Sequence, residues 1–174
     1  MGQGDFVSRE LDHGRIDEPR WKLLSAAEDR LKSAQTLEDI IELVRKTARS
    51  VCSADGVTFV LRDGRQCHYV EEDAIGPLWK GQRFPMEMCI SGWAMLNEQT
   101  AVIEDIFVDP RIPHDAYRKT FVKSLIMAPA GKDPMAAMGA YWSERRKPSP
   151  REVAAIEAMA NAVGDAMKRV LLGG

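Results

Sequence analysis

The segment from Phe84 to Glu104 constrains the fold of this chain more than any other stretch. It begins as an extended Phe-Pro-Met run, turns at Ser91-Gly92 into a short helix that carries Trp93, and ends in a second apolar strand. A strand that leads into a short helix and then into another strand forms one wall of a concave surface. We expect the Ser91 hydroxyl to cap the helical turn and Gly92 to allow a close backbone approach.

Size and composition indicate a single domain with an ordinary apolar core. The chain has 174 residues, of which 45% are hydrophobic, and its formal net charge of -2 gives no general attraction to nucleic acid or anionic membranes. The longest apolar run is much shorter than the roughly 20 residues that a membrane span needs, and the N-terminus lacks the apolar core of a signal peptide. We therefore expect a cytoplasmic protein without membrane insertion or nucleic-acid binding.

Three amphipathic helices are expected outside this wall. Apolar residues recur every three to four positions over about residues 21–33, 37–52 and 150–171. The second and third helices start with capping-box sequences at Thr36 and Ser149, and a proline follows Ser149 at the first helical position. Residues 1–19 contain charges and glycine but little apolar content, which predicts a mobile lead-in to one domain over residues 20–172.

Strands occupy most of the chain between the second and third helices. Residues 57–62 are typical of a strand, and Asp63-Gly64 predicts a tight hairpin to a second strand over residues 65–72. Two apolar segments, residues 124–131 and 135–144, have the composition of central strands. The segment 105–121 contains two prolines and is long enough to have a function of its own. Together with the wall it forms the predicted pocket region, residues 84–121.

The order of these elements resembles the GAF domain family. The similarity covers residues 21–171, and its segment 123–142 is most similar to the GAF modules of bacterial two-component sensor histidine kinases. The resemblance implies an α+β fold with an antiparallel central sheet of five or six strands, terminal helices on one face, and loops and short helices around a pocket on the other. The motifs that carry it are RFPM (83–86), ISGWA (90–94), VIED (102–105), VKSLIMAP (122–129) and GAYW (139–142).

This resemblance implies a sensory module of a bacterial signal-transduction system that binds a small molecule. It would signal through its terminal helices, as a homodimer, to a histidine kinase or another output domain. The alternative is a ligand-free domain that serves only for dimerisation or interaction. An apolar or aromatic-faced ligand is expected to contact Phe84, Met86, Trp93, Phe107, His114, Tyr117, Met127 and Met138. Dimer contacts are expected from Trp21, Leu24, Leu31, Val163, Met167, Val170 and Leu171.

The ligand and cofactor remain unknown, because the residues that mark the known GAF chemistries are not matched. Pro113 stands where bilin-binding members carry their attachment cysteine, which argues against a covalent bilin and leaves noncovalent tetrapyrrole binding open. Ser91 stands where the members that reduce free methionine sulfoxide need a cysteine, and Cys89 lies two residues too early. Cyclic-nucleotide binders carry Asn-Lys and Asp-Glu pairs that are missing here, although Phe107 and Asp109 lie in a suitable region.

The sequence predicts neither a catalytic nor a metal site. No serine-histidine-aspartate grouping, phosphate loop or pair of catalytic carboxylates has suitable spacing, so we expect no enzymatic activity. Three cysteines, Cys52, Cys67 and Cys89, without a CxxC pair argue against a disulfide framework or a zinc site. Cys67 and His68 are neighbours and would point to opposite faces of a strand. His114 is the only candidate haem ligand in the pocket loop.

Overall fold

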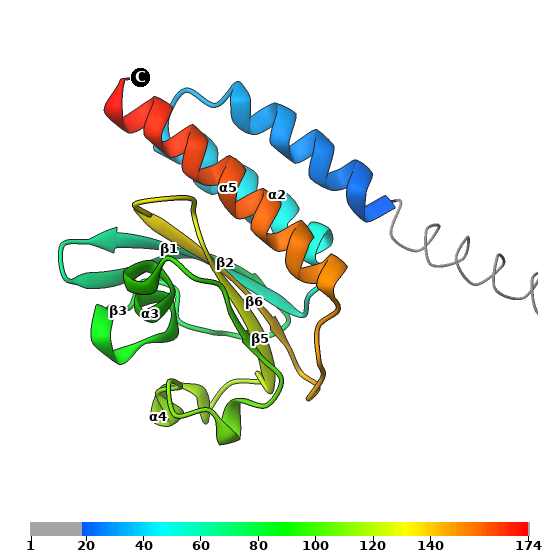
Figure 1. Ribbon diagram of the computed structural model, residues 1–174, viewed down its shortest axis with the longest axis vertical. Coiled ribbons are helices and arrows are strands. Elements are labelled where there is room, and N and C mark those ends of the chain that lie inside the picture. The colour runs from blue at the N-terminus through cyan, green and yellow to red at the C-terminus, as the bar shows by residue number, and fades with distance from the viewer. Residues whose placement is uncertain (1–18, 174) are drawn as a thin grey trace, which may run out of the picture.

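Six antiparallel strands form a single sheet (Figure 1). The computed structural model describes residues 19–173. The strand order across the sheet is β3-β2-β1-β6-β5-β4, so the first hairpin and the last pair of long strands meet at its centre. The predicted α+β class and antiparallel sheet are confirmed. The strands are β1 (Gly56–Asp63), β2 (Gln66–Ala74), β3 (Arg83–Pro85), β4 (Ala101–Ile103), β5 (Ser124–Pro129) and β6 (Ala136–Trp142).

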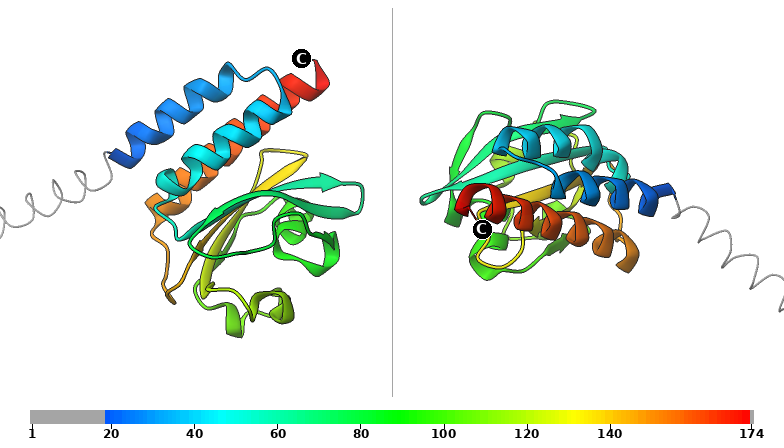
Figure 2. Two further views of the ribbon diagram at one scale, coloured as in Figure 1. Left: turned by 180° about the vertical axis from the view of Figure 1, so that it is seen from behind. Right: turned by 90° about the horizontal axis from the view of Figure 1, so that it is seen from above.

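The strands β5 and β6 are buried on both faces of the sheet. Every residue of β6 is buried, and so is every residue of β5 except Pro129. Because successive side chains of a strand point to opposite faces, both sides of the sheet need a covering layer. Figure 1 and Figure 2 show helices on one side and the shorter elements of the middle of the chain on the other.

The helical layer consists of α2 (Leu37–Cys52), α5 (Pro150–Leu172) and an N-terminal helix over residues 19–32, which lies farther from the sheet (Figure 2). Both α2 and α5 begin with the expected capping boxes, Thr36 with Asp39 and Ser149 with Glu152. The apolar stripes of the three helices form one core with the side chains on this face of the sheet. All three predicted helices are therefore present, and their ends agree within two residues.

Arg169 joins α5 to the end of the N-terminal helix. Its guanidinium group donates hydrogen bonds to the main-chain oxygens of Ala34, at 2.7 Å, and Leu31, at 2.8 Å. The last carbonyl groups of a helix have no partner inside the helix, so a cationic side chain is a favourable ligand for them. The charged end of Arg169 thus fixes the two helices to each other.

The other face of the sheet is covered by the connection 75–82 and by two short helices, α3 (Ile90–Asn97) and α4 (His114–Tyr117). Two single turns, η1 (Met86–Met88) and η2 (Ile106–Val108), complete this layer. A β carbon added at Gly92 would lie 1.8 Å from the carbonyl oxygen of Met86. Only glycine therefore lets α3 pack against η1, as the sequence predicts.

Some details of the prediction are wrong. Ser91 does not cap α3, because the helix begins at Ile90 with Cys89 as its N-cap, and the Ser91 hydroxyl bonds to Tyr69. The two-residue hairpin loop is Gly64-Arg65, since Asp63 pairs with Gln66. The predicted lead-in lies outside the described residues except for Pro19, which belongs to the N-terminal helix. Between residues 19 and 173, no helix is both long and apolar enough to cross a membrane.

Replacing Gly92 with alanine tests the close contact between α3 and η1. The methyl group would collide with backbone atoms of Met86, so Gly92→Ala should lower the free energy of unfolding by about 1–3 kcal/mol or more. Urea denaturation followed by circular dichroism measures the change. Gly76→Ala is the control, because its nearest neighbour would be a Phe121 carbon at 3.6 Å, an ordinary contact. Equal stabilities for the two variants would contradict this packing.

Candidate functional site

Aromatic rings fill the face of the sheet where the sequence predicts a pocket. Trp79, from the connection 75–82, lies at the centre. Its ring centroid is 5.7 Å from that of Tyr69, 4.5 Å from that of Tyr117 and 5.4 Å from that of Tyr141. The cavity between these rings has a volume of about 10 Å³, enough for about one water-sized molecule. We call it the aromatic cavity; it is lined by Tyr69, Trp79, Phe84, Cys89, Pro113, Ala116 and Tyr117.

Two sets of hydrogen bonds hold Trp79 in place. The Glu72 carboxylate accepts hydrogen bonds from the backbone N–H groups of Leu78 at 2.9 Å, Trp79 at 2.8 Å and Lys80 at 2.7 Å. The indole Nε1 of Trp79 donates to the main-chain oxygen of Ala116 at 3.0 Å. The hydrogen bond from Trp79 to Ala116 connects the segment 75–82 directly to α4, so α4 and the Trp79 ring close the aromatic cavity together.

The hydroxyl of Tyr117 differs from those of the other two buried tyrosines around Trp79. Tyr69 pairs with Ser91 at 2.9 Å and Tyr141 with Thr58 at 2.8 Å. Tyr117 is only 4% exposed, and its hydroxyl has no hydrogen-bond partner among the described residues. Burial raises the pKa of all three tyrosines, so all are neutral. An unsatisfied buried polar group costs about 1–3 kcal/mol of stability. The hydroxyl of Tyr117 is such a group, whereas those of Tyr69 and Tyr141 are not.

The loop before α4 packs against the wall from outside. The guanidinium carbon of Arg111 lies 4.4 Å from the ring centroid of Trp93. Arg111 also makes a bidentate pair with Asp109, at 3.0 and 2.7 Å, and these hydrogen bonds hold the pKa of Asp109 below its ordinary value. Arg111 is therefore the main link between this loop and α3.

Sequence and structure comparisons identify the family. Residues 34–168 match the sequence profile described as the GAF domain. The chain belongs to the GAF domain family. None of the curated proteins matches this GAF domain significantly. The identities to solved structures given below are all under 25%, so those similarities concern the fold alone.

Three solved structures illustrate the shared fold. One is the GAF domain of a phosphoenolpyruvate-protein phosphotransferase from Coxiella burnetii, with a TM-score of 0.77, 15% identity and coverage of 89% of this chain and 96% of that chain. A free methionine-R-sulfoxide reductase from Neisseria meningitidis, in complex with its substrate, has a TM-score of 0.75, 14% identity and coverages of 89% and 92%. The phycocyanobilin-bound GAF domain of a cyanobacterial phytochrome has a TM-score of 0.71, 17% identity and coverages of 88% and 96%.

The predicted ligand contacts are only partly brought together in this GAF domain. Phe84 and Tyr117 line the aromatic cavity, and Met86 and Met127 are buried in the core beside it. Met138 is buried on the opposite face, against the helices, and cannot line the cavity. It is opposite Ala128 in the sheet, and both side chains point toward the helical layer.

The remaining predicted contacts lie toward the surface. Trp93 is half-buried beneath Arg111, His114 is half-buried in α4, and Phe107 is 62% exposed. No cluster of three or more metal-ligating side chains that includes His114, or any other described residue, is present. The prediction missed Tyr69 and Trp79, two central residues of the cavity. The alternation of β2 could have indicated Tyr69, whereas nothing local distinguishes Trp79.

Four of the seven predicted dimer contacts have another role. Trp21 and Leu171 are exposed, by 37% and 47%, and Val170 is half-buried. The others are almost completely buried in the chain's own helical core and are not available to a partner in this conformation. These four are Leu24, Leu31, Val163 and Met167.

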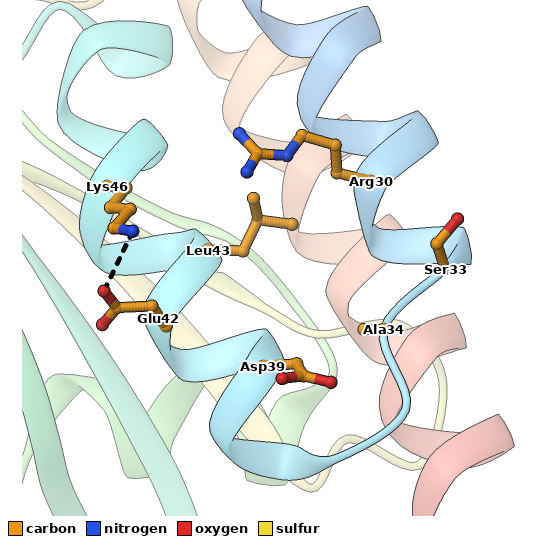
Figure 3. A pocket seen from close by; sticks show the side chains of 7 residues that line it. All are labelled: Arg30, Ser33, Ala34, Asp39, Glu42, Leu43 and Lys46. Carbon is orange, nitrogen blue, oxygen red and sulfur yellow. Dashed lines mark ion pairs between the residues drawn. The ribbon is translucent and has the colours of Figure 1, made fainter.

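Two roomier grooves among the described residues lie between helices. A groove of about 270 Å³ separates the N-terminal helix from α2; Figure 3 shows Arg30 and Leu43 facing each other across it, with the Glu42–Lys46 ion pair at its side. A second groove, of about 460 Å³, lies between the N-terminal helix and α5. Both are open to solvent and edged by charged side chains, so they lack the enclosed apolar walls typical of small-molecule sites.

Two tyrosine-to-phenylalanine variants test the account of the aromatic cavity. Tyr117→Phe removes an unpaired hydroxyl, so the free energy of unfolding should stay the same or increase. Tyr141→Phe leaves the Thr58 hydroxyl without its partner and should lower that free energy by about 1–2 kcal/mol. Chemical denaturation of both variants beside the wild type checks this. A loss at Tyr117 as large as that at Tyr141 would contradict the assignment.

Proposed function

We propose that this GAF domain is a sensory module of a bacterial signal-transduction pathway that binds a small molecule at the aromatic cavity. The Tyr117 hydroxyl is the observation that carries the proposal, because it is a buried donor that a ligand oxygen would satisfy. Two structures of the same fold support it: one is described as phycocyanobilin-bound and another as a complex with its substrate. The present cavity is the closed form of the site.

Opening the site requires movement of α4. This helix has four residues, and its main connection to the opposite wall is the hydrogen bond from Trp79 to Ala116. A ligand with an aromatic face would replace the Trp79–Tyr117 ring contact, and its polar group would pair with Tyr117. The energy of these new contacts would shift the population from the closed form to the open form.

The signal would reach the terminal helices through β5. Side chains on one face of β5 pack beside the aromatic cavity, and those on the other pack against α5, so a shift of the strand reaches both layers. Just beyond β5, α5 approaches the backbone closely: a β carbon at Gly164 would lie 2.3 Å from the carbonyl oxygen of Ala130. We propose that a homodimer formed through the exposed ends of the terminal helices passes this shift to a histidine kinase or another output domain.

The second candidate function is ligand-free dimerisation. It is favoured by one observation, the filling of the predicted pocket by the chain's own aromatic side chains. In that case the pathway would use the helices alone, and α4 would remain closed.

Native mass spectrometry separates the two functions. Wild-type protein purified from a bacterial host under mild conditions should carry a small-molecule adduct, and Tyr117→Phe should carry less of it because the polar contact is lost. Tyr141→Phe is the control, since its hydroxyl already pairs with Thr58. Wild-type protein without any adduct, and without a gain in thermal stability in a panel of small aromatic compounds, would favour the ligand-free function.

A charge at the end of α5 tests the dimer. Leu171→Glu should weaken self-association at least about tenfold, equivalent to about 1.4 kcal/mol, because a carboxylate would replace an apolar contact. Analytical ultracentrifugation across a range of protein concentrations gives the dissociation constant. Leu96→Glu is the matched control, because Leu96 is 52% exposed on α3, compared with 47% for Leu171. A monomeric wild type, or equal effects of both variants, would rule out this interface.

A further inference from the structure

Two of the three cysteines meet beside the aromatic cavity. Cys67 belongs to β2 and Cys89 directly precedes α3, and they are 0% and 5% exposed. Cys67 is opposite Phe84 in the sheet, and η1 then brings the chain back to place Cys89 next to it. Both thiols belong to the same buried cluster, and each is the strongest influence on the pKa of the other, as expected for neighbouring sulfur atoms. The third cysteine, Cys52, is buried in the helical core on the other face of the sheet.

The surroundings make the two thiols unequal. The Cys89 sulfur lies 3.3 Å from the Ser91 hydroxyl oxygen, at the N-terminus of α3, where the helix dipole favours an anion. In its protonated form the Cys89 thiol donates a hydrogen bond to the carbonyl oxygen of Pro85, at 3.5 Å. The neighbouring Cys67 thiol, followed by the Ser91 hydroxyl, lowers the pKa of Cys89 to about 7, although burial and the charge of Glu87 oppose the shift. The same contact raises the pKa of Cys67. Cys89 is therefore the cysteine of the pair that more readily forms a thiolate, and Cys67 keeps its proton.

The aromatic cavity gives a small polar molecule a place beside this thiolate. Cys89 and Tyr117 both line it, and its volume of about 10 Å³ suits a molecule close to water in size. The Tyr117 hydroxyl is buried and has no partner among residues 19–173, so it can donate a hydrogen bond to an oxygen atom held there. Hydrogen peroxide is the hydroperoxide nearest to water in size, and it has the acceptor oxygens that the Tyr117 hydroxyl requires.

We propose that Cys67 and Cys89 form a dithiol site that hydrogen peroxide oxidises to an intramolecular disulfide. The Cys89 thiolate attacks one peroxide oxygen, the O–O bond breaks, and the other oxygen leaves as water after taking up a proton. The resulting Cys89 sulfenic acid is attacked by the Cys67 sulfur, and its oxygen leaves as water with the Cys67 proton. The two thiols supply both electrons that reduce the peroxide. The reaction requires no bound ligand, so it is independent of the proposed small-molecule sensing.

Mass spectrometry of the full chain tests this reaction. The reduced protein is treated with a small excess of hydrogen peroxide, and its mass should fall by about 2 Da as two hydrogens are lost, with a peptide that links Cys67 to Cys89. The rate should rise with pH and level off above the Cys89 pKa of about 7, because the thiolate is the reactive form. Dithiothreitol should restore the original mass.

Single variants assign the role of each residue. Cys67→Ser should stop at a mass gain of about 16 Da on Cys89, trapped by dimedone, because no resolving thiol remains. Cys89→Ser should lose the fast reaction with hydrogen peroxide. Tyr117→Phe should be oxidised several-fold more slowly than the wild type, and Cys52→Ser should be oxidised at the wild-type rate. Circular dichroism confirms that each variant is folded. An unchanged wild-type mass, a disulfide that involves Cys52, or an intermolecular product only would overturn the proposal without affecting the ligand-binding test.

Discussion

The burial of β5 and β6 on both faces is the constraint on which the rest of the structure depends. A sheet with apolar side chains on each side is stable only between two covering layers. Regular amphipathic helices provide one layer. The other consists mainly of single turns and connections, so individual contacts hold it together: the Gly92 approach to Met86, the Glu72 carboxylate beneath three backbone N–H groups, and the Arg111 contact with Trp93. The candidate site lies in this second layer.

The sequence predicts the elements whose signals are local. The capping boxes of α2 and α5 and the periodic apolar stripes place the helix ends within two residues. Asp63-Gly64 predicts the tight hairpin, although its loop is shifted by one residue to Gly64-Arg65. The prediction fails where the partner is distant in the chain. Serine is a residue type that commonly caps helices, but the hydroxyl of Ser91 pairs with Tyr69 in β2, which is distant in the sequence.

Two further errors have a physical cause in the sequence itself. The segment AAMGAYW of β6 contains no polar residue, so nothing indicates which side chains face the helices, and Met138 was placed on the wrong side. The apolar stripe of α5 looks wide enough to serve a second subunit. A stripe does not show what covers it, and here Val163 and Met167 are buried in the chain's own helical core. The sequence likewise does not show whether aromatic residues line a cavity or fill it. Nor does it show that Cys67 and Cys89 lie close together after folding.

The two hydrogen bonds of Arg169 have a mechanical consequence. They hold the carbonyl groups of Leu31, in the last turn of the N-terminal helix, and of Ala34, just beyond it, against α5, although these helices are separated by the entire sheet in the sequence. If α5 turns or slides, the N-terminal helix must either move with it or lose both bonds. While both bonds are kept, a displacement of α5 is therefore passed directly to the N-terminal helix.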